Sequence, residues 1–302
     1  MRMKSAQENT AIRKVLKPTG ILFVAFSFGL GISAAHYLGG RIELPILLVG
    51  LIVCLLIRDM GNFLGAFFDH PESYHSNLTL NDPEREDLLS IRRPLLFQYS
   101  MLILTAIATL TTILMLRGAL VTGGLLLVGI ALFLIFFSAV PPLRLSRKGY
   151  AELVEALFIA NLVPAIAFSL TGMPLSFILI ELTLPLTLIY LAMKIALAFI
   201  AYGFDSTHGR QSLTIRLGWQ NALVLHNVFI LSAFVLVGVF LLLGLPWSLT
   251  WPILLALPVG VLQILLLQGI ANGVKPRWVL LHWVAVGLFL LTIYMEIISL
   301  WI

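Results

Sequence analysis

The sequence predicts an all-α protein that crosses a membrane many times, built as a single domain over residues 1–302. Of its 302 residues, 60% are hydrophobic and only 11% are charged, and the mean hydropathy is +1.04. Soluble domains carry about 25% charged residues. Apolar stretches of roughly 20 residues recur along the chain and match the thickness of a bilayer core. Backbone polar groups in lipid must bond within their own segment, so these stretches are predicted to be helices.

Glycine and proline pairs between the apolar stretches divide the chain into nine predicted transmembrane helices. The predicted spans are Thr19–Leu38, Glu43–Phe68, Leu95–Leu116, Leu120–Val140, Tyr150–Leu170, Leu175–Ala201, Ala222–Leu243, Leu249–Ile270 and Trp278–Leu300. The polar, basic residues 1–18 are not followed by a short apolar core with a small-residue cleavage site. We therefore interpret them as a segment that precedes a retained first span.

The distribution of basic residues supports this count and predicts an orientation. With nine spans, one side of the membrane holds fifteen of the nineteen Lys and Arg residues and the other side holds two, Arg41 and Arg117. The fifteen are Arg2, Lys4, Arg13, Lys14, Lys17, Arg85, Arg92, Arg93, Arg144, Arg147, Lys148, Arg210, Arg216, Lys275 and Arg277. Cytoplasmic loops carry such an excess, so the N-terminus and the longer loops are predicted to be cytoplasmic.

Composition also excludes several classes of function. The net charge of +5 lies in short loops and forms no basic stripe, so nucleic acid is not expected as a partner. Cys54 is the only cysteine, which excludes a disulfide or a thiolate metal site within one chain.

Two spans leave the membrane in the same way. Arg58 precedes Asp69 by eleven residues in the second span, and Lys194 precedes Asp205 by eleven in the sixth. Eleven residues are about three helical turns, so each cation shares a helix face with its aspartate and lies roughly 16 Å deeper. The segment from Lys194 to Gly218 is predicted to leave its helix near Ala201 and to place Asp205 in a polar loop.

These residues have a functional interpretation and a structural one. Two aspartates at one membrane edge could share a Mg²⁺ ion, which often joins one or two carboxylates to a substrate phosphate. Arginines on the same side would hold phosphate oxygens; the candidates are Arg92, Arg93, Arg210 and Arg216. Alternatively, the aspartates are solvated loop residues, and Arg58 and Lys194 pair within the bundle or reach to its edge.

Three segments of the chain resemble the UbiA superfamily of intramembrane prenyltransferases. Residues 61–69, Gly-Asn-Phe-Leu-Gly-Ala-Phe-Phe-Asp, are similar to its first aspartate-rich motif, G-N-x-x-N-D-x-x-D. Residues 140–153 are similar to its P-P-L-R-L…G-x-x-E-L segment, in the version typical of the branch that prenylates dihydroxynaphthoate. Residues 205–218 resemble the end of its second motif, D-x-x-x-G-K-x-T-L-x-V-R-L-G.

The resemblance implies a UbiA-type bundle of nine helices, in which an allylic prenyl diphosphate ionises with the help of Mg²⁺ and transfers its isoprenoid to a lipophilic, quinone-precursor-like acceptor. By matching positions, it implies Asp69, Asp205 and Glu72 as metal ligands, with Asp69 and Asp205 as catalytic groups. Lys194 and Arg58, which share helix faces with these aspartates, are predicted to act with them in catalysis. The implied substrate-binding residues are Asn62, His75, Arg144, His208, Arg210 and Arg216.

The sequence departs from the family's motifs at metal-binding positions. Gly65 and Ala66 replace the N-D pair of the first motif, and Ala201 replaces the leading aspartate of the second. Three functions therefore remain open: a prenyltransferase with fewer metal ligands, a membrane terpene cyclase that quenches the cation with an internal alkene, and a non-catalytic relative. A transporter is a fourth alternative and ranks last.

Overall fold

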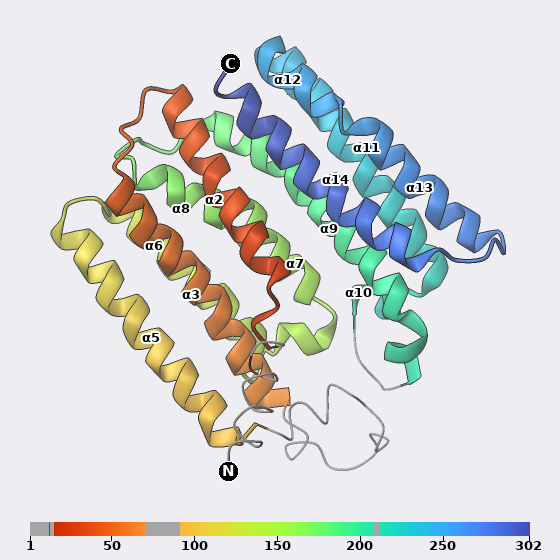
Figure 1. Ribbon diagram of the computed structural model, residues 1–302, viewed down its shortest axis with the longest axis horizontal. Coiled ribbons are helices and arrows are strands. Elements are labelled where there is room, and N and C mark those ends of the chain that lie inside the picture. Colours follow the sequence, from red (N-terminus) through yellow and green to blue (C-terminus); the bar gives the residue numbers. More distant parts are fainter. Residues whose placement is uncertain (1–11, 13–14, 70–90, 208–211) are drawn as a thin grey trace.

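The computed structural model describes residue 12 and residues 15–69, 91–207 and 212–302 of the chain, with the backbone alone at 204 and 205. Every regular element in these ranges is a helix (Figure 1). The first four spans are α2 (Thr19–Tyr37), α3 (Leu44–Asp69), α5 (Arg93–Leu116) and α6 (Thr122–Ala139). The last spans are α11 (Trp219–Leu243), the pair α12 (Trp247–Leu254) and α13 (Leu257–Ala271), and α14 (Trp278–Ser299).

The fifth and sixth spans form the centre of the molecule. The fifth is composed of α7 (Ala151–Ala156), the π-helix η3 (Leu157–Leu162) and α8 (Val163–Ser169), and the sixth is α9 (Phe177–Thr207). The short helices η2 (Leu145–Lys148) and α10 (Leu213–Leu217) precede α7 and α11. Within the described residues, nine segments are long and apolar enough to cross a membrane, which confirms the predicted count.

The structure corrects the predicted end of the sixth span. Helix α9 continues six residues beyond Ala201 to Thr207, so Asp205 lies in the last turns of the helix and not in a loop. Packing explains the extension, because the rings of Phe199 and Tyr202 both lie against Trp219 at the start of α11. Apolar support on one side allows a helix to project beyond its uniformly apolar stretch.

Two predicted spans are irregular at prolines. The eighth breaks between α12 and α13, ahead of Pro258, because proline has no N–H to bond to the Leu254 carbonyl and its ring clashes with that group in a continuous helix. The fifth widens into the π-helix η3 ahead of Pro164. Proline has no N–H for the helical ladder, and a π-turn is one way in which a helix accommodates the loss. Within η3, the Asn161 side-chain amide donates to Thr187 Oγ1 of α9 at 2.6 Å.

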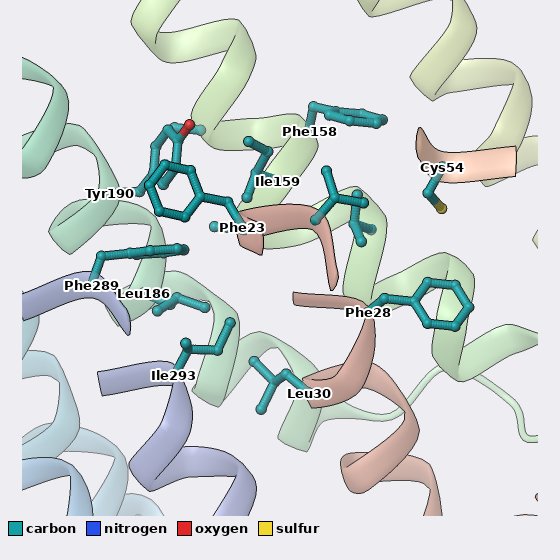
Figure 2. Packing of buried hydrophobic residues seen from close by; sticks show 14 of the residues in the cluster. Phe23, Phe28, Leu30, Cys54, Phe158, Ile159, Leu186, Tyr190, Phe289 and Ile293 are labelled. Carbon is teal, nitrogen blue, oxygen red and sulfur yellow. The ribbon is translucent and has the colours of Figure 1, made fainter. Parts of the chain in front are cut away.

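The helices pack around α9 and the fifth span. Helix α3 packs along α5 and α2 packs against α8 (Figure 1), and α9 contacts both α11 and α14. An aromatic cluster joins α2, α9 and α14: Phe23, Tyr190 and Phe289 meet edge to face with ring centroids 5.0–5.9 Å apart (Figure 2). Edge-to-face packing adds to the burial of these large rings and fixes the three helices against one another.

Unequal helix lengths define one end of the bundle, here named the Asp69 end. Helix α2 has 19 residues, whereas α3 has 26 and α9 has 31. Arg58 of α3 bonds to the carbonyl groups of Leu16 and Lys17, which immediately precede α2. Asp69 therefore lies eleven residues, or roughly 16 Å, beyond the level at which α2 begins.

The close approach of α2 to α8 predicts that Gly31 cannot be replaced freely. A Cβ atom there would lie 2.2 Å from the backbone oxygen of Pro164. Because backbone cannot move aside cheaply, Gly31→Ala is expected to destabilise the fold by about 1–3 kcal/mol and lower the thermal unfolding midpoint in detergent. Gly287→Ala in α14 is the control, since nothing lies within 4 Å of its new Cβ. Equal midpoints for both variants would contradict the packing described.

Candidate functional site

Charged side chains gather at the Asp69 end around the connection between α6 and α7. The Asp69 carboxylate oxygen Oδ1 accepts hydrogen bonds from Arg144 Nη2 at 2.6 Å and from Arg147 Nε at 3.1 Å. Arg144 Nη2 also donates to the backbone oxygen of Phe68 at 2.8 Å. Charge-assisted bonds of this kind are short and comparatively strong. They tie the last turn of α3 to the segment Pro141–Tyr150, which the sequence singled out for its P-P-L-R-L pattern.

A third arginine reaches the same connection from α10. Arg216 Nη1 donates to the Lys148 carbonyl oxygen at 3.1 Å, and its guanidinium carbon lies 4.6 Å from the centre of the Tyr150 ring. Gly149 has φ of +77°, and a Cβ there would lie 3.2 Å from the backbone oxygen of Ser212, so a glycine lets α10 pack closely. We name Arg144, Arg147 and Arg216 the arginine cluster.

A second charged group lies deeper, between the fifth span and α9. Lys194 Nζ of α9 and Glu155 Oε2 of α7 form an ion pair at 2.7 Å, with side chains 26% and 38% exposed. The fully buried Tyr190 places its hydroxyl beside the Glu155 carboxylate, and Glu152 lies close enough to act electrostatically on Lys194. We name Glu155 and Lys194 the central ion pair. Glu155 follows Tyr150 by five residues and so lies about 7 Å further into the bundle than the arginine cluster.

Arg58, predicted as a catalytic cation, makes its contacts to the chain itself. Its side chain is 8% exposed, its Nη1 pairs with Asp59 at 3.0 Å, and its Nη2 donates to the carbonyl oxygens of Leu16 and Lys17. A Cβ at Gly20 would lie 2.3 Å from Arg58 Nη2, so the guanidinium fills the space beside that glycine. Arg58 thus anchors the segment before α2, although it also lies near enough to act electrostatically on Lys194.

The remaining predicted site residues divide into described and undescribed ones. Asn62 is half-buried in α3, one turn beyond Arg58. Asp205 lies in α9, but its side chain is outside the described part. Glu72, His75, His208 and Arg210 fall within residues 70–90 and 208–211, which also lie outside it.

The described residues do not by themselves form a metal site. Among them, no three His, Cys, Asp or Glu side chains are grouped as metal ligands. Asp69 is the one predicted ligand whose side chain is described, and its Oδ1 is held by two guanidinium groups. Carboxylate oxygens suit Mg²⁺ in chemical type, but a second and a third ligand would have to come from Asp205 and Glu72.

Sequence reasoning missed Arg147, Glu155 and Tyr190 as site residues. Arg147 follows Arg144 by three residues, which places both near Asp69 through the turn of η2. Glu155 follows Glu152 by three residues and is one of few charges inside a predicted span, a signal that marks functional positions in membranes. Tyr190 precedes Lys194 by four residues and therefore shares its helix face. Each of these signals was present in the spacing.

Comparison with known proteins agrees with this architecture. The family model described as the UbiA prenyltransferase family matches residues 21–269, which is most of the chain. The chain belongs to the UbiA prenyltransferase family. No curated protein matches the sequence significantly.

Solved structures of UbiA proteins share the fold at low sequence identity. A UbiA homolog from Archaeoglobus fulgidus, solved bound to GPP and Mg²⁺, has a TM-score of 0.67 and 14% identity over 95% of this chain and 99% of that one. A structure reported for digeranylgeranylglyceryl phosphate synthase has a TM-score of 0.66 and 16% identity over 99% of both chains. A UbiA homolog from Aeropyrum pernix K1 in its apo form has a TM-score of 0.62 and 15% identity, covering 92% and 97%.

The central ion pair makes a prediction about stability. Lys194→Met leaves the Glu155 carboxylate without its partner and is expected to destabilise the protein by about 2 kcal/mol. This is below the roughly 3–5 kcal/mol of a fully buried pair because both side chains are partly exposed.

The double variant Lys194→Met/Glu155→Gln removes both charges and is expected to recover part of that loss, as measured by thermal unfolding in detergent. Strictly additive losses in the two single variants and the double variant would show that the two side chains are not coupled.

Proposed function

We propose that this UbiA protein is an intramembrane prenyltransferase that moves an isoprenoid from a prenyl diphosphate to a lipophilic, quinone-precursor-like acceptor. The observation that carries the proposal is the excess of positive charge at the Asp69 end of an apolar bundle. Arg144 and Arg147 bond to Asp69, and Arg216 and Lys148 lie on the same connection between α6 and α7. A diphosphate is an anion that such a group would hold, while its isoprenoid chain requires apolar surroundings.

The arginine cluster would bind the diphosphate and stabilise the charge that it gains as the C1–O bond of the donor breaks. Asn62, and His75, His208 and Arg210 from the undescribed segments, are proposed to complete the substrate contacts. Lys194 is proposed to add positive charge from deeper in the bundle. Arg58 is proposed to contribute by its charge and by holding the segment before α2 in place, because its hydrogen bonds go to Leu16, Lys17 and Asp59. The Archaeoglobus fulgidus homolog was solved with GPP, which supports a donor of this class.

Mg²⁺ is proposed as the cofactor, with Asp69, Asp205 and Glu72 as its ligands. Asp69 is the last residue of α3, Glu72 follows it by three residues in the sequence, and Asp205 precedes the end of α9 by two. The Archaeoglobus fulgidus homolog was solved with Mg²⁺. When bound, the ion would supply positive charge to the leaving diphosphate. With Gly65, Ala66 and Ala201 at three family ligand positions, the arginine cluster would supply more of that charge than the metal does.

The Asp69 end is proposed to face the cytoplasm. The chain is an integral membrane protein with nine apolar spans in its described part. Arg144, Arg147, Lys148 and Arg216 are all placed at the Asp69 end by the contacts above, in agreement with the predicted fifteen-to-two distribution of basic residues. The positive-inside rule assigns such an end to the cytoplasm. A water-soluble diphosphate donor group would then enter from that side.

Two other functions fit parts of the site. A membrane terpene cyclase would use the same ionisation at the arginine cluster and would need no acceptor, because an internal alkene of the donor quenches the cation. A non-catalytic lipid-binding relative is favoured by the internal bonds of Asp69 to Arg144 and Arg147, which occupy a motif carboxylate without any ligand.

The proposal predicts that the purified protein releases diphosphate from a prenyl diphosphate in a Mg²⁺-dependent reaction. Asp69→Ala or Asp205→Ala is expected to lower the rate by about 100-fold or more, because charge at the leaving group is a large part of such catalysis. Thermal unfolding of each variant checks that the fold is intact. If both variants keep full activity, the metal assignment is wrong.

The same assay separates the three functions by their products. A transferase forms a prenylated acceptor only when a quinone precursor is added, whereas a cyclase forms a cyclic hydrocarbon from the donor alone. A non-catalytic relative releases no diphosphate and shows no Mg²⁺-linked thermal shift with a prenyl diphosphate analogue. Product identification by mass spectrometry decides among them.

A further inference from the structure

The central ion pair differs in charge from the arginine cluster above it. Among the described residues at the Asp69 end, Arg144 and Arg147 share one carboxylate and Arg216 bonds only to a backbone oxygen, but Lys194 is matched by Glu155 at 2.7 Å. The other charges that act on the pair also balance, since Glu152 and Asp59 oppose Arg58 and Lys17. A nearly neutral site does not suit a diphosphate, which the Glu155 carboxylate would repel.

A lysine and a carboxylate in contact suit a hydroxyl group. The ammonium of Lys194 donates hydrogen bonds to the hydroxyl oxygen, and the carboxylate of Glu155 accepts its proton. Both side chains keep part of their surface exposed, at 26% and 38%, which leaves atoms of the pair open to contact with a ligand. Tyr190 below them is fully buried and fixed against Phe23 and Phe289, which gives the pair a rigid apolar base (Figure 2).

We propose that Glu155 and Lys194 bind the hydroxyl group of the acceptor and that Glu155 takes its proton. This inference rests on the proposed prenyl transfer and defines the acceptor as a lipophilic molecule that carries a hydroxyl. The C1–O bond of the donor breaks and the diphosphate leaves with its electron pair. A new bond forms between C1 and the acceptor oxygen, and the hydroxyl proton passes to the Glu155 carboxylate. If C1 instead bonds to the ring carbon ortho to the hydroxyl, the same proton passes to Glu155 and the hydrogen on that ring carbon then moves to the oxygen.

The position of Glu155 supports this assignment. It lies about 7 Å further into the bundle than Tyr150, whose ring is in contact with the Arg216 guanidinium. A donor that places its diphosphate on the arginine cluster and its isoprenoid chain in the apolar interior would therefore direct its C1 atom toward the central ion pair. Lys194 and Glu155 come from the two spans at the centre of the molecule. Further along the same spans, the Asn161 side-chain amide donates a hydrogen bond to Thr187 Oγ1 at 2.6 Å. Helix contacts on both sides of the pair hold it in place, as a proton acceptor requires.

The test compares Glu155→Gln with wild type in two assays on the purified full-length protein, with Mg²⁺, a prenyl diphosphate and a hydroxylated quinone precursor. Glutamine keeps a hydrogen-bond acceptor for Lys194 but cannot take a proton. We expect diphosphate release to stay within about threefold of wild type, while the ratio of prenylated acceptor to prenyl alcohol and alkene falls at least tenfold. Glu181→Gln, a carboxylate thirteen residues from Lys194 on α9, is the control and leaves that ratio unchanged.

Two outcomes would overturn the inference. If diphosphate release and transfer fall together, Glu155 acts only by positioning Lys194 near the diphosphate. If the product ratio stays at the wild-type value, Glu155 takes no proton. Failure of the proposed function itself is distinct, because wild type would then release no diphosphate from the donor at all.

Discussion

The ion pair of Glu155 and Lys194 is the interaction on which the interior of this bundle depends. A charge inside a chain that is 60% hydrophobic is costly unless a partner meets it, and these two side chains meet at 2.7 Å between the fifth span and α9. The pair aligns two central helices that run past each other, and Asn161 and Thr187 repeat the connection at a second level. The other helices pack around this axis, with α2 and α14 joined to it through an aromatic cluster.

The two charged groups lie at different depths along these central helices. The arginine cluster carries more positive charge than the one carboxylate to which it bonds, Asp69, while the charges of the central ion pair cancel. This separation matches the two parts of a prenyl donor and acceptor: an anion that stays near water, and a reacting carbon and hydroxyl that must lie away from it. Ala66 and Ala201 stand at carboxylate positions of the family motifs and Gly65 stands at an asparagine position, and these replacements likewise leave arginines as the main groups around an anion.

The fold could be predicted almost completely from the sequence, because apolar length, loop charge and turn residues all depend on the bilayer alone. Nine spans were predicted and are present in the described residues. The errors came from contacts that a hydropathy pattern does not contain. Helix α9 extends past Ala201 because Tyr202 packs on Trp219, and the eighth span breaks ahead of Pro258. The first is a tertiary contact with another helix, and the second is a local effect of proline that an average of hydropathy does not register.

The site was predicted less well, for a related reason. The family motifs direct attention to Asp69, Arg144 and Arg216, and the structure does bring these residues to one end. Lys194 was assigned a role as a lone cation, but its partner Glu155 belongs to another span and no motif contains it. Arg58 was assigned by its spacing to Asp69, whereas its guanidinium bonds to the segment before α2. Spacing within one helix gives the face of a residue but not its partner.

The measurement that tests this account most directly is a cryo-EM structure of the protein with Mg²⁺ and a prenyl thiolodiphosphate, which ionises poorly and therefore stays intact. The account predicts the diphosphate between Arg144, Arg147 and Arg216, and C1 of the prenyl chain directed toward Glu155 and Lys194. A diphosphate bound away from the Asp69 end, or a prenyl chain on the lipid-facing surface of the bundle, would contradict it.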